Sequence, residues 1–163
     1  MWWYGNGIDN NLKEARGGAA SLQGIVGEPV GLLHNDTQGI LKDVAENLTN
    51  GLQLKDVVMA QFLENNLNDG KNHYITAFSN ANEDIYKGFK TMSLEGRTLN
   101  SNVTLISVGS PRSLKDLVEV ADQANVGNVV QFQNSWDPVT NPKAWVAGTL
   151  GLAAGAAVTG VVL

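Results

Sequence analysis

The run from Val103 to Val108 is almost continuously apolar, which is typical of a strand covered on both faces of a parallel sheet. Several other short apolar runs occur along the chain, and segments with apolar residues at helical spacing separate them. Strands that alternate with amphipathic helices are joined by right-handed crossovers. The sequence therefore predicts an α/β fold, with a mainly parallel sheet of about five strands and helices on both faces. The predicted strands begin, in chain order, at Trp2, Pro29, Tyr74, Val103 and Val129.

The composition is that of one globular domain. The chain has 163 residues, of which 43% are hydrophobic and 17% charged. Its net charge of −5 and the absence of a Lys/Arg cluster argue against a nucleic-acid-binding surface. Cysteine is absent, which excludes disulfides, thiolate ligands and a cysteine nucleophile. Two histidines, His34 and His73, are too few and too isolated for a zinc site, and we predict neither a metal nor a cofactor.

Polar residues follow most of the predicted strands. In a parallel sheet the chemistry lies at the carboxyl ends of the strands. The residues expected there are Asn6, His34, Ser79, Ser110 and Asp137. A serine and an aspartate among them are two of the three side chains that a serine hydrolase needs.

Ser79 lies on a predicted sharp turn, between an apolar strand and a helix that begins after Asn80–Asn82. Such a turn lifts a serine hydroxyl above the sheet and directs a helix N-terminus at the reacting oxygen. The usual signature is Gly-x-Ser-x-Gly, and here Ala77 and Ala81 replace both glycines. The alternative is a serine that only caps the following helix. Glu83 and Asp84, in the first turn of that helix, complement the helix dipole and need no further role.

Two later segments add to this pattern. The stretch Val103–Arg112, which ends in Gly-Ser-Pro-Arg, resembles the Phe-Gly-x-Pro-Arg strand end of the class 3 (fungal-type) lipases in the α/β-hydrolase superfamily. Val129–Val139 resembles their Asn-x-x-Asp-x-Val segment. The Asn6–Ile8 turn and Asn35–Gly39 are similar to lipase-like domains near the C-terminal ends of large secreted bacterial proteins, including haemagglutinin-like proteins and polymorphic toxins. The resemblance spans Tyr4 to Val139.

The resemblance implies a serine esterase or lipase that acts on an acyl ester or lipid. Ser79 would be the nucleophile, and Asp137 would orient a catalytic histidine. Backbone N–H groups of Asn80 and of the Gly5–Gly7 turn, with Gly7 as the second donor, would bind the oxyanion. The Asp-Pro at residue 137 and the glycines are equally consistent with ordinary turns. The resemblance also implies a secreted or cell-surface bacterial protein, in which this domain is part of a larger polypeptide.

Two departures from the family pattern concern the catalytic base. Phe78 stands before the serine, where these enzymes commonly have a histidine, and no histidine follows His73. Either the base lies beyond residue 163 or the domain has lost its chemistry, so we expect this chain alone to be nearly inactive. His34 borders the expected cleft and is an alternative base, although a structural role suits it better; His73 lies at the wrong end of its strand. The alternative function is a non-catalytic folding, delivery or interaction module of a toxin-like protein.

The chain divides into residues 1–144, the hydrolase-like domain, and residues 145–163, an apolar Gly/Ala-rich segment. We expect that segment to be a helix or tail that covers the strand edge beginning at Val129; a membrane contact through it is the alternative. The resemblance predicts a sheet that lacks the usual first and last strands, with the Pro29 strand at one edge. The strands at Trp2, Tyr74, Val103 and Val129 would follow it across the sheet.

Overall fold

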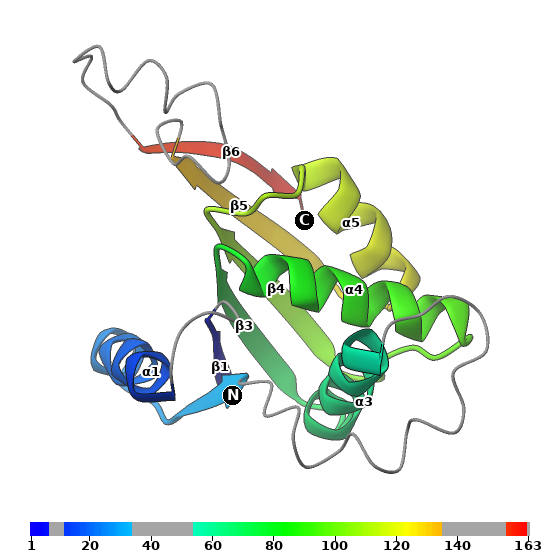
Figure 1. Cartoon of the computed structure of the whole chain (residues 1–163), viewed down its shortest axis with the longest axis horizontal. Coiled ribbons are helices and arrows are strands. Elements are labelled where there is room, and N and C mark those ends of the chain that lie inside the picture. Colours follow the sequence, from blue (N-terminus) through cyan, green and yellow to red (C-terminus); the bar gives the residue numbers. More distant parts are fainter. Residues whose placement is uncertain (7–11, 34–53, 135–155, 163) are drawn as a thin grey trace.

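The computed structural model describes residues 1–6, 12–33, 54–134 and 156–162. They form one six-stranded sheet in the order β2-β1-β3-β4-β5-β6, with helices packed on it (Figure 1). The strands are β1 (Trp2–Gly5), β2 (Val30–Leu33), β3 (Asn72–Phe78), β4 (Asn102–Val108), β5 (Asn128–Asn134) and β6 (Ala156–Val162).

The first five strands are all parallel, as the sequence predicted. Their order across the sheet also agrees with the prediction, because the strand after Pro29 lies at one edge and β1, β3, β4 and β5 follow. In the long central pair, His73 of β3 aligns with Val103 of β4, and Phe78 aligns with Val108. The α/β fold with a parallel sheet is therefore confirmed.

Neighbouring residues of β1 show that helices cover both faces of the sheet. The Trp3 ring packs edge-on against Phe62, with ring centroids 6.4 Å apart. The Tyr4 side chain points to the opposite face. It packs against Gly18 there, because a Cβ atom added to Gly18 would lie only 2.1 Å from the Tyr4 hydroxyl oxygen. Helix α1 (Leu12–Val26), which contains Gly18, thus lies on one face, and α3 (Leu54–Leu67), which contains Phe62, lies on the other.

Two more helices continue the layer that α3 begins. Helix α4 (Ala81–Leu94) packs against α3, and α5 (Leu114–Gln123) packs against α4 (Figure 1). Their apolar residues meet the inward side chains of β3, β4 and β5 in one core. The close approach of α3 to α4 depends on Gly88, where a Cβ atom would lie 2.7 Å from Leu63. The largest side chains sealed in this core include Phe89, Leu63, Leu67, Ile75, Ile85, Met92, Leu105 and Leu117.

The apolar C-terminal segment contributes a strand where we had expected a helix or tail. Residues 156–162 form β6, which pairs antiparallel with β5 from Val129↔Val162 to Asn134↔Ala156. The helix expectation is wrong for these residues, and the physical reason is the edge of β5. A sheet edge presents unpaired N–H and C=O groups, and a β-branched stretch such as Val-Thr-Gly-Val-Val pairs with them readily. The expectation that this segment covers the Val129 edge is confirmed for residues 156–162.

Removal of residues 156–163 is expected to make the protein self-associate, because the deletion exposes the backbone N–H and C=O groups along the β5 edge that β6 pairs with. Size-exclusion chromatography without detergent measures this as a shift from monomer to oligomer or aggregate. A variant that lacks only Leu163 is the control and is expected to elute like the intact chain. If the longer deletion also elutes as a monomer, β6 does not protect the edge.

Candidate functional site

Ser79 lies on the sharp turn that the sequence predicted, between the end of β3 at Phe78 and the start of α4 at Ala81. Its backbone φ is +48°, a left-handed conformation that costs a non-glycine residue roughly 1–2 kcal/mol. The Ser79 N–H donates to the carbonyl oxygen of Val108 at 2.9 Å, so the turn is fixed to the end of β4. Ser79 itself is partly exposed. Strain that the surrounding structure holds in place is a common property of reactive turns.

The Ser79 hydroxyl does not cap the helix. Within the described residues it makes no hydrogen bond, and Asn80, the N-cap residue of α4, makes no side-chain cap hydrogen bond either. The backbone N–H of Asn80 also has no partner in this part of the chain. A serine hydroxyl and a backbone N–H, both without a partner among the described residues, thus lie next to each other at a helix N-terminus, where negative charge is favoured.

Small residues make this turn possible. Ala77 is fully buried and Ala81 nearly so. A Cβ atom added to Gly5, at the end of β1, would lie 3.4 Å from the Cβ of Ala81 and 3.6 Å from Ile85. Larger side chains at these positions would push α4 away from the sheet. The two alanines therefore serve the packing need that glycines meet in the usual signature.

The loop after β4 forms the neighbouring wall of the site. Gly109 has φ +59° and donates its N–H to the carbonyl of Phe132 at 2.9 Å. The Ser110 hydroxyl is buried and accepts the N–H of Arg112 at 3.0 Å. Gln131, buried on β5, donates its side-chain amide to the Arg112 carbonyl at 2.9 Å. The loop is thus tied to β5 at both ends.

Arg112 joins this loop to the first turns of α4. Its guanidinium donates to both carboxylate oxygens of Glu83, at 2.5 and 2.6 Å, and lies 4.3 Å from the centre of the Tyr86 ring. The hydrogen bonds from Arg112 outweigh burial and lower the pKa of Glu83; Lys87, 3.4 Å away, adds to this. Glu83 therefore does more than complement the helix dipole, because it fixes the loop beside Ser79.

Asp84 lies in a different environment, although it follows Glu83 directly. Its side chain is buried, and burial raises its pKa to about 6, against the opposing charges of Lys55 and Lys87. No hydrogen bond or ion pair to Asp84 occurs within the described residues. A carboxylate with a raised pKa is common at functional sites, because burial there tunes proton affinity. The expected complement to the helix dipole therefore comes from a carboxyl that, unlike Glu83, is buried and holds its proton more tightly.

The structure brings together only part of the predicted site. Ser79 and Asn80 are adjacent at the carboxyl edge of the sheet, as expected. Asp137, Gly7 and His34 lie outside the described residues, so their predicted roles stay predictions.

His73 lies at the amino end of β3, as the sequence indicated. It accepts the indole N–H of Trp3 on Nδ1 at 3.1 Å, while Nε2 lies 2.7 Å from a carboxylate oxygen of Asp69. Because an indole N–H can only donate, the proton must sit on Nε2. The hydrogen bond from His73, and then that from Lys71, lower the pKa of Asp69 well below its usual range. This histidine is a structural link and not the missing base.

Comparison of the chain with models of known families, with curated protein sequences and with solved structures found no match. The site must therefore be interpreted from its own geometry. Among the described residues, no helix is both long enough and apolar enough to cross a membrane.

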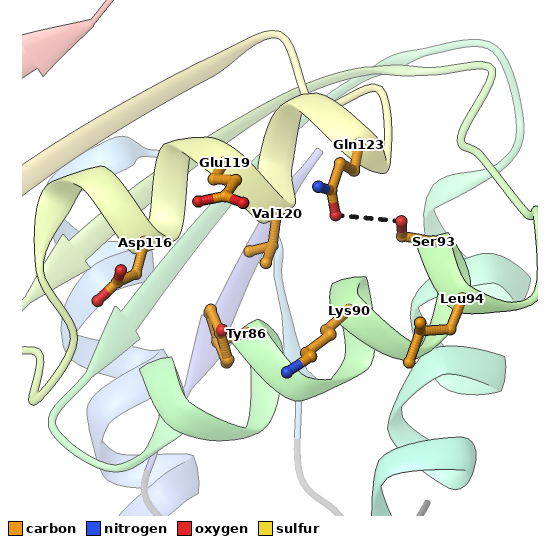
Figure 2. A pocket seen from close by; sticks show the side chains of 8 residues that line it. All are labelled: Tyr86, Lys90, Ser93, Leu94, Asp116, Glu119, Val120 and Gln123. Carbon is orange, nitrogen blue, oxygen red and sulfur yellow. Dashed lines mark hydrogen bonds between the residues drawn. The ribbon is translucent and has the colours of Figure 1, made fainter. Parts of the chain in front are cut away.

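Two surface cavities lie away from Ser79. The larger, of about 200 Å³, lies between α4 and α5 (Figure 2). Tyr86 and Lys90 line it from one helix, Asp116 and Glu119 from the other, and Ser93 bonds Gln123 across it at 3.1 Å. The second, of about 150 Å³, lies between α5 and the start of β5. Neither contains a residue of the Ser79 turn.

The residue that the sequence analysis missed is Asn82. It is completely buried in the first turn of α4, and its side-chain nitrogen lies within 3.2 Å of three backbone carbonyl oxygens around Ser79. A polar residue in the first turn of a helix gives no sequence signal of burial, because such positions usually face water.

Proposed function

We propose that this chain is a serine-hydrolase-like domain of the esterase or lipase type, with Ser79 as its nucleophile. The observation that supports the proposal best is the left-handed Ser79 turn: among the described residues, neither the Ser79 hydroxyl nor the adjacent N–H of Asn80 has a hydrogen-bond partner. The parallel sheet order and the lipase-like segments around Arg112 and Asp137 agree with it.

The proposed chemistry follows from these groups. The Ser79 oxygen attacks the ester carbonyl carbon and loses its proton to a base, and the carbonyl oxygen becomes an oxyanion. The Asn80 N–H donates to that oxyanion, and Gly7 supplies the second donor. Collapse of the intermediate expels the alcohol and leaves an acyl-serine, which water then hydrolyses. Asp137 orients the histidine that acts as the base.

The base itself is absent from the described surroundings of Ser79. His73 lies at the other end of β3, roughly 20 Å away at about 3.3 Å per residue. We therefore propose that this chain alone reacts slowly, and that a longer secreted or cell-surface bacterial polypeptide, of the polymorphic-toxin kind, completes the site. His34 is the other residue of this chain that can be tested as a base.

A fluorophosphonate probe tests the nucleophile. Labelling of a longer natural polypeptide that contains these residues is expected, with at least about a hundredfold loss in the Ser79→Ala variant. Ser93→Ala, at a partly exposed serine in α4, the helix that follows the Ser79 turn, is the matched control and is expected to keep the labelling. The chain of 163 residues alone is expected to label far more slowly.

If a folded longer polypeptide does not label, the enzyme proposal is wrong. The absence of a histidine beside Ser79 in the described residues then favours the second candidate, a non-catalytic folding, delivery or interaction module. Hydrolysis of short-chain p-nitrophenyl esters by the chain alone, at ordinary enzyme rates, would instead show that the base is already present.

A further inference from the structure

Asn82 occupies an unusual position for an amide side chain. It is fully buried, and its nitrogen lies 3.2 Å from the carbonyl oxygen of Ala77, 3.0 Å from that of Ser79 and 3.2 Å from that of Val108. All three neighbours are acceptors, so the orientation of the amide is unambiguous: its nitrogen must face them. Two N–H groups are thus shared among three carbonyls.

These carbonyls belong to the three parts of the chain that meet at the turn: the end of β3, the turn itself and the end of β4. The Ser79 carbonyl accepts both the side-chain nitrogen and the backbone N–H of Asn82, at 3.0 and 3.1 Å. The Ser79 N–H donates to Val108, which also accepts from Asn82. The peptide groups on both sides of the Ser79 Cα are therefore fixed by one small network.

The oxygen end of the amide differs from its nitrogen end. Within the described residues, Oδ1 of Asn82 is buried and makes no hydrogen bond. A buried unpaired acceptor costs roughly 1–3 kcal/mol in general, so an apolar residue would suit simple core packing better. The benefit of the amide must come from its N–H groups and hence from the three carbonyls that they hold.

We propose that Asn82 is a positioning residue that holds Ser79 in its left-handed conformation and so aims the hydroxyl and the Asn80 N–H at the same point. The catalytic meaning of this hold rests on the function proposed above. This hold, meaning the restraint that the Asn82 hydrogen bonds place on the backbone of the turn, can be measured without any catalysis.

Amide hydrogen exchange in the Asn82→Ala variant tests the hold, and the fold supplies an internal control. The Ser79 N–H donates to the last residue of β4, and the Gly109 N–H donates to β5 in the equivalent place; both distances are 2.9 Å. Only the first bond lies in the Asn82 network. Exchange at Ser79 is expected to accelerate by roughly tenfold or more relative to exchange at Gly109. Equal acceleration at both sites would mean global destabilisation and would overturn the proposal.

Asn82→Ser provides a graded variant. A serine in a helix can donate back to the carbonyl three residues earlier, which here is that of Ser79. The acceleration at Ser79 is expected to be smaller than with alanine. If alanine prevents folding, the serine variant is compared with the wild-type protein in the same way. In the wild type, the side-chain N–H₂ of Asn82 must itself exchange slowly, and rapid exchange would also overturn the proposal.

Probe labelling separates this inference from the proposed function. If the wild-type polypeptide labels at Ser79, Asn82→Ala is expected to slow labelling by about ten- to a hundredfold, because small misplacements of reacting groups are costly. Unchanged labelling would overturn the positioning role. If the wild type does not label, the proposed function fails, while the exchange data still decide whether Asn82 holds the turn.

Discussion

Replacement of His73 by leucine is expected to lower the free energy of unfolding by about 2–4 kcal/mol, the largest effect that we predict for a single side chain. Leucine keeps most of the buried volume but can neither accept the indole N–H of Trp3 nor donate to Asp69. The Trp3 N–H would then be buried without a partner. Denaturant unfolding followed by circular dichroism measures the change, at a pH near 7.

Two further variants isolate the hydrogen bonds from the packing. Glutamine at position 73 retains one acceptor and one donor, so His73→Gln is expected to lose less stability than His73→Leu. Trp3→Phe removes the donor that leucine would leave unpaired. The double variant Trp3→Phe/His73→Leu should therefore lose less free energy of unfolding than the two single variants lose in sum. Strict additivity would show that the Trp3–His73 bond contributes nothing to stability.

Asp84→Asn is expected to stabilise the protein at pH 7. Burial raises the pKa of this carboxyl to about 6 in the folded protein, from an ordinary value of 3.8. A shift of this size corresponds to roughly 3 kcal/mol. Because the asparagine amide must itself be buried at some cost in the same place, we expect a gain of about 1–2 kcal/mol. Unfolding experiments between pH 3 and pH 8 would measure it, at about one-unit pH intervals.

The direction of the pH dependence follows from proton binding. The folded protein holds the Asp84 proton more tightly than the unfolded chain does. Stability is therefore lost as the pH rises from the unfolded pKa near 4 through the folded value of about 6. Below pH 4 the carboxyl is protonated in both states, and the advantage of asparagine should vanish. A gain that stays constant from pH 3 to pH 8 would contradict this explanation.

The neighbouring carboxylate provides a control of opposite sign. Arg112 lowers the pKa of Glu83, so the stability from that pair is present above the unfolded pKa and is lost as the pH falls through the folded value. Glu83→Gln is accordingly expected to destabilise the protein at pH 7 and to have little effect in acid. Two adjacent residues on one helix should thus give pH profiles of opposite slope.

Much of the fold could be predicted because hydrophobic periodicity depends on local sequence. Val30–Leu33 and Val103–Val108 are short apolar runs between breaks, and both are strands in the structure. The end of the chain could not be predicted in this way. Val158 to Val162 lie in a Gly/Ala-rich segment without charge, and the exposed edge of β5, a tertiary feature, decides that they form a strand.

The candidate site shows a similar limit. The strand–serine–helix pattern located Ser79, since the change of period marks the turn. No pattern could reveal that Asn82 is buried or that Glu83 and Asp84 differ, because all three are polar residues at the start of a helix. Their environments depend on Arg112, Val108 and the α3 helix, which lie far away in the sequence.

The position of β1 has a consequence for how the chain folds. This strand lies between β2 and β3, so an N-terminal segment occupies an inner place in the sheet. Its bond from Trp3 to His73 joins residues 70 positions apart. During synthesis, the aromatic residues Trp2 to Tyr4 must therefore wait, unpaired on one side, until β3 has been made. Such long-range parallel pairing slows folding, and the aromatic, aggregation-prone segment of β1 stays exposed until the pairing is complete. We expect the nascent chain to depend on chaperones that bind aromatic segments until β3 has been synthesised.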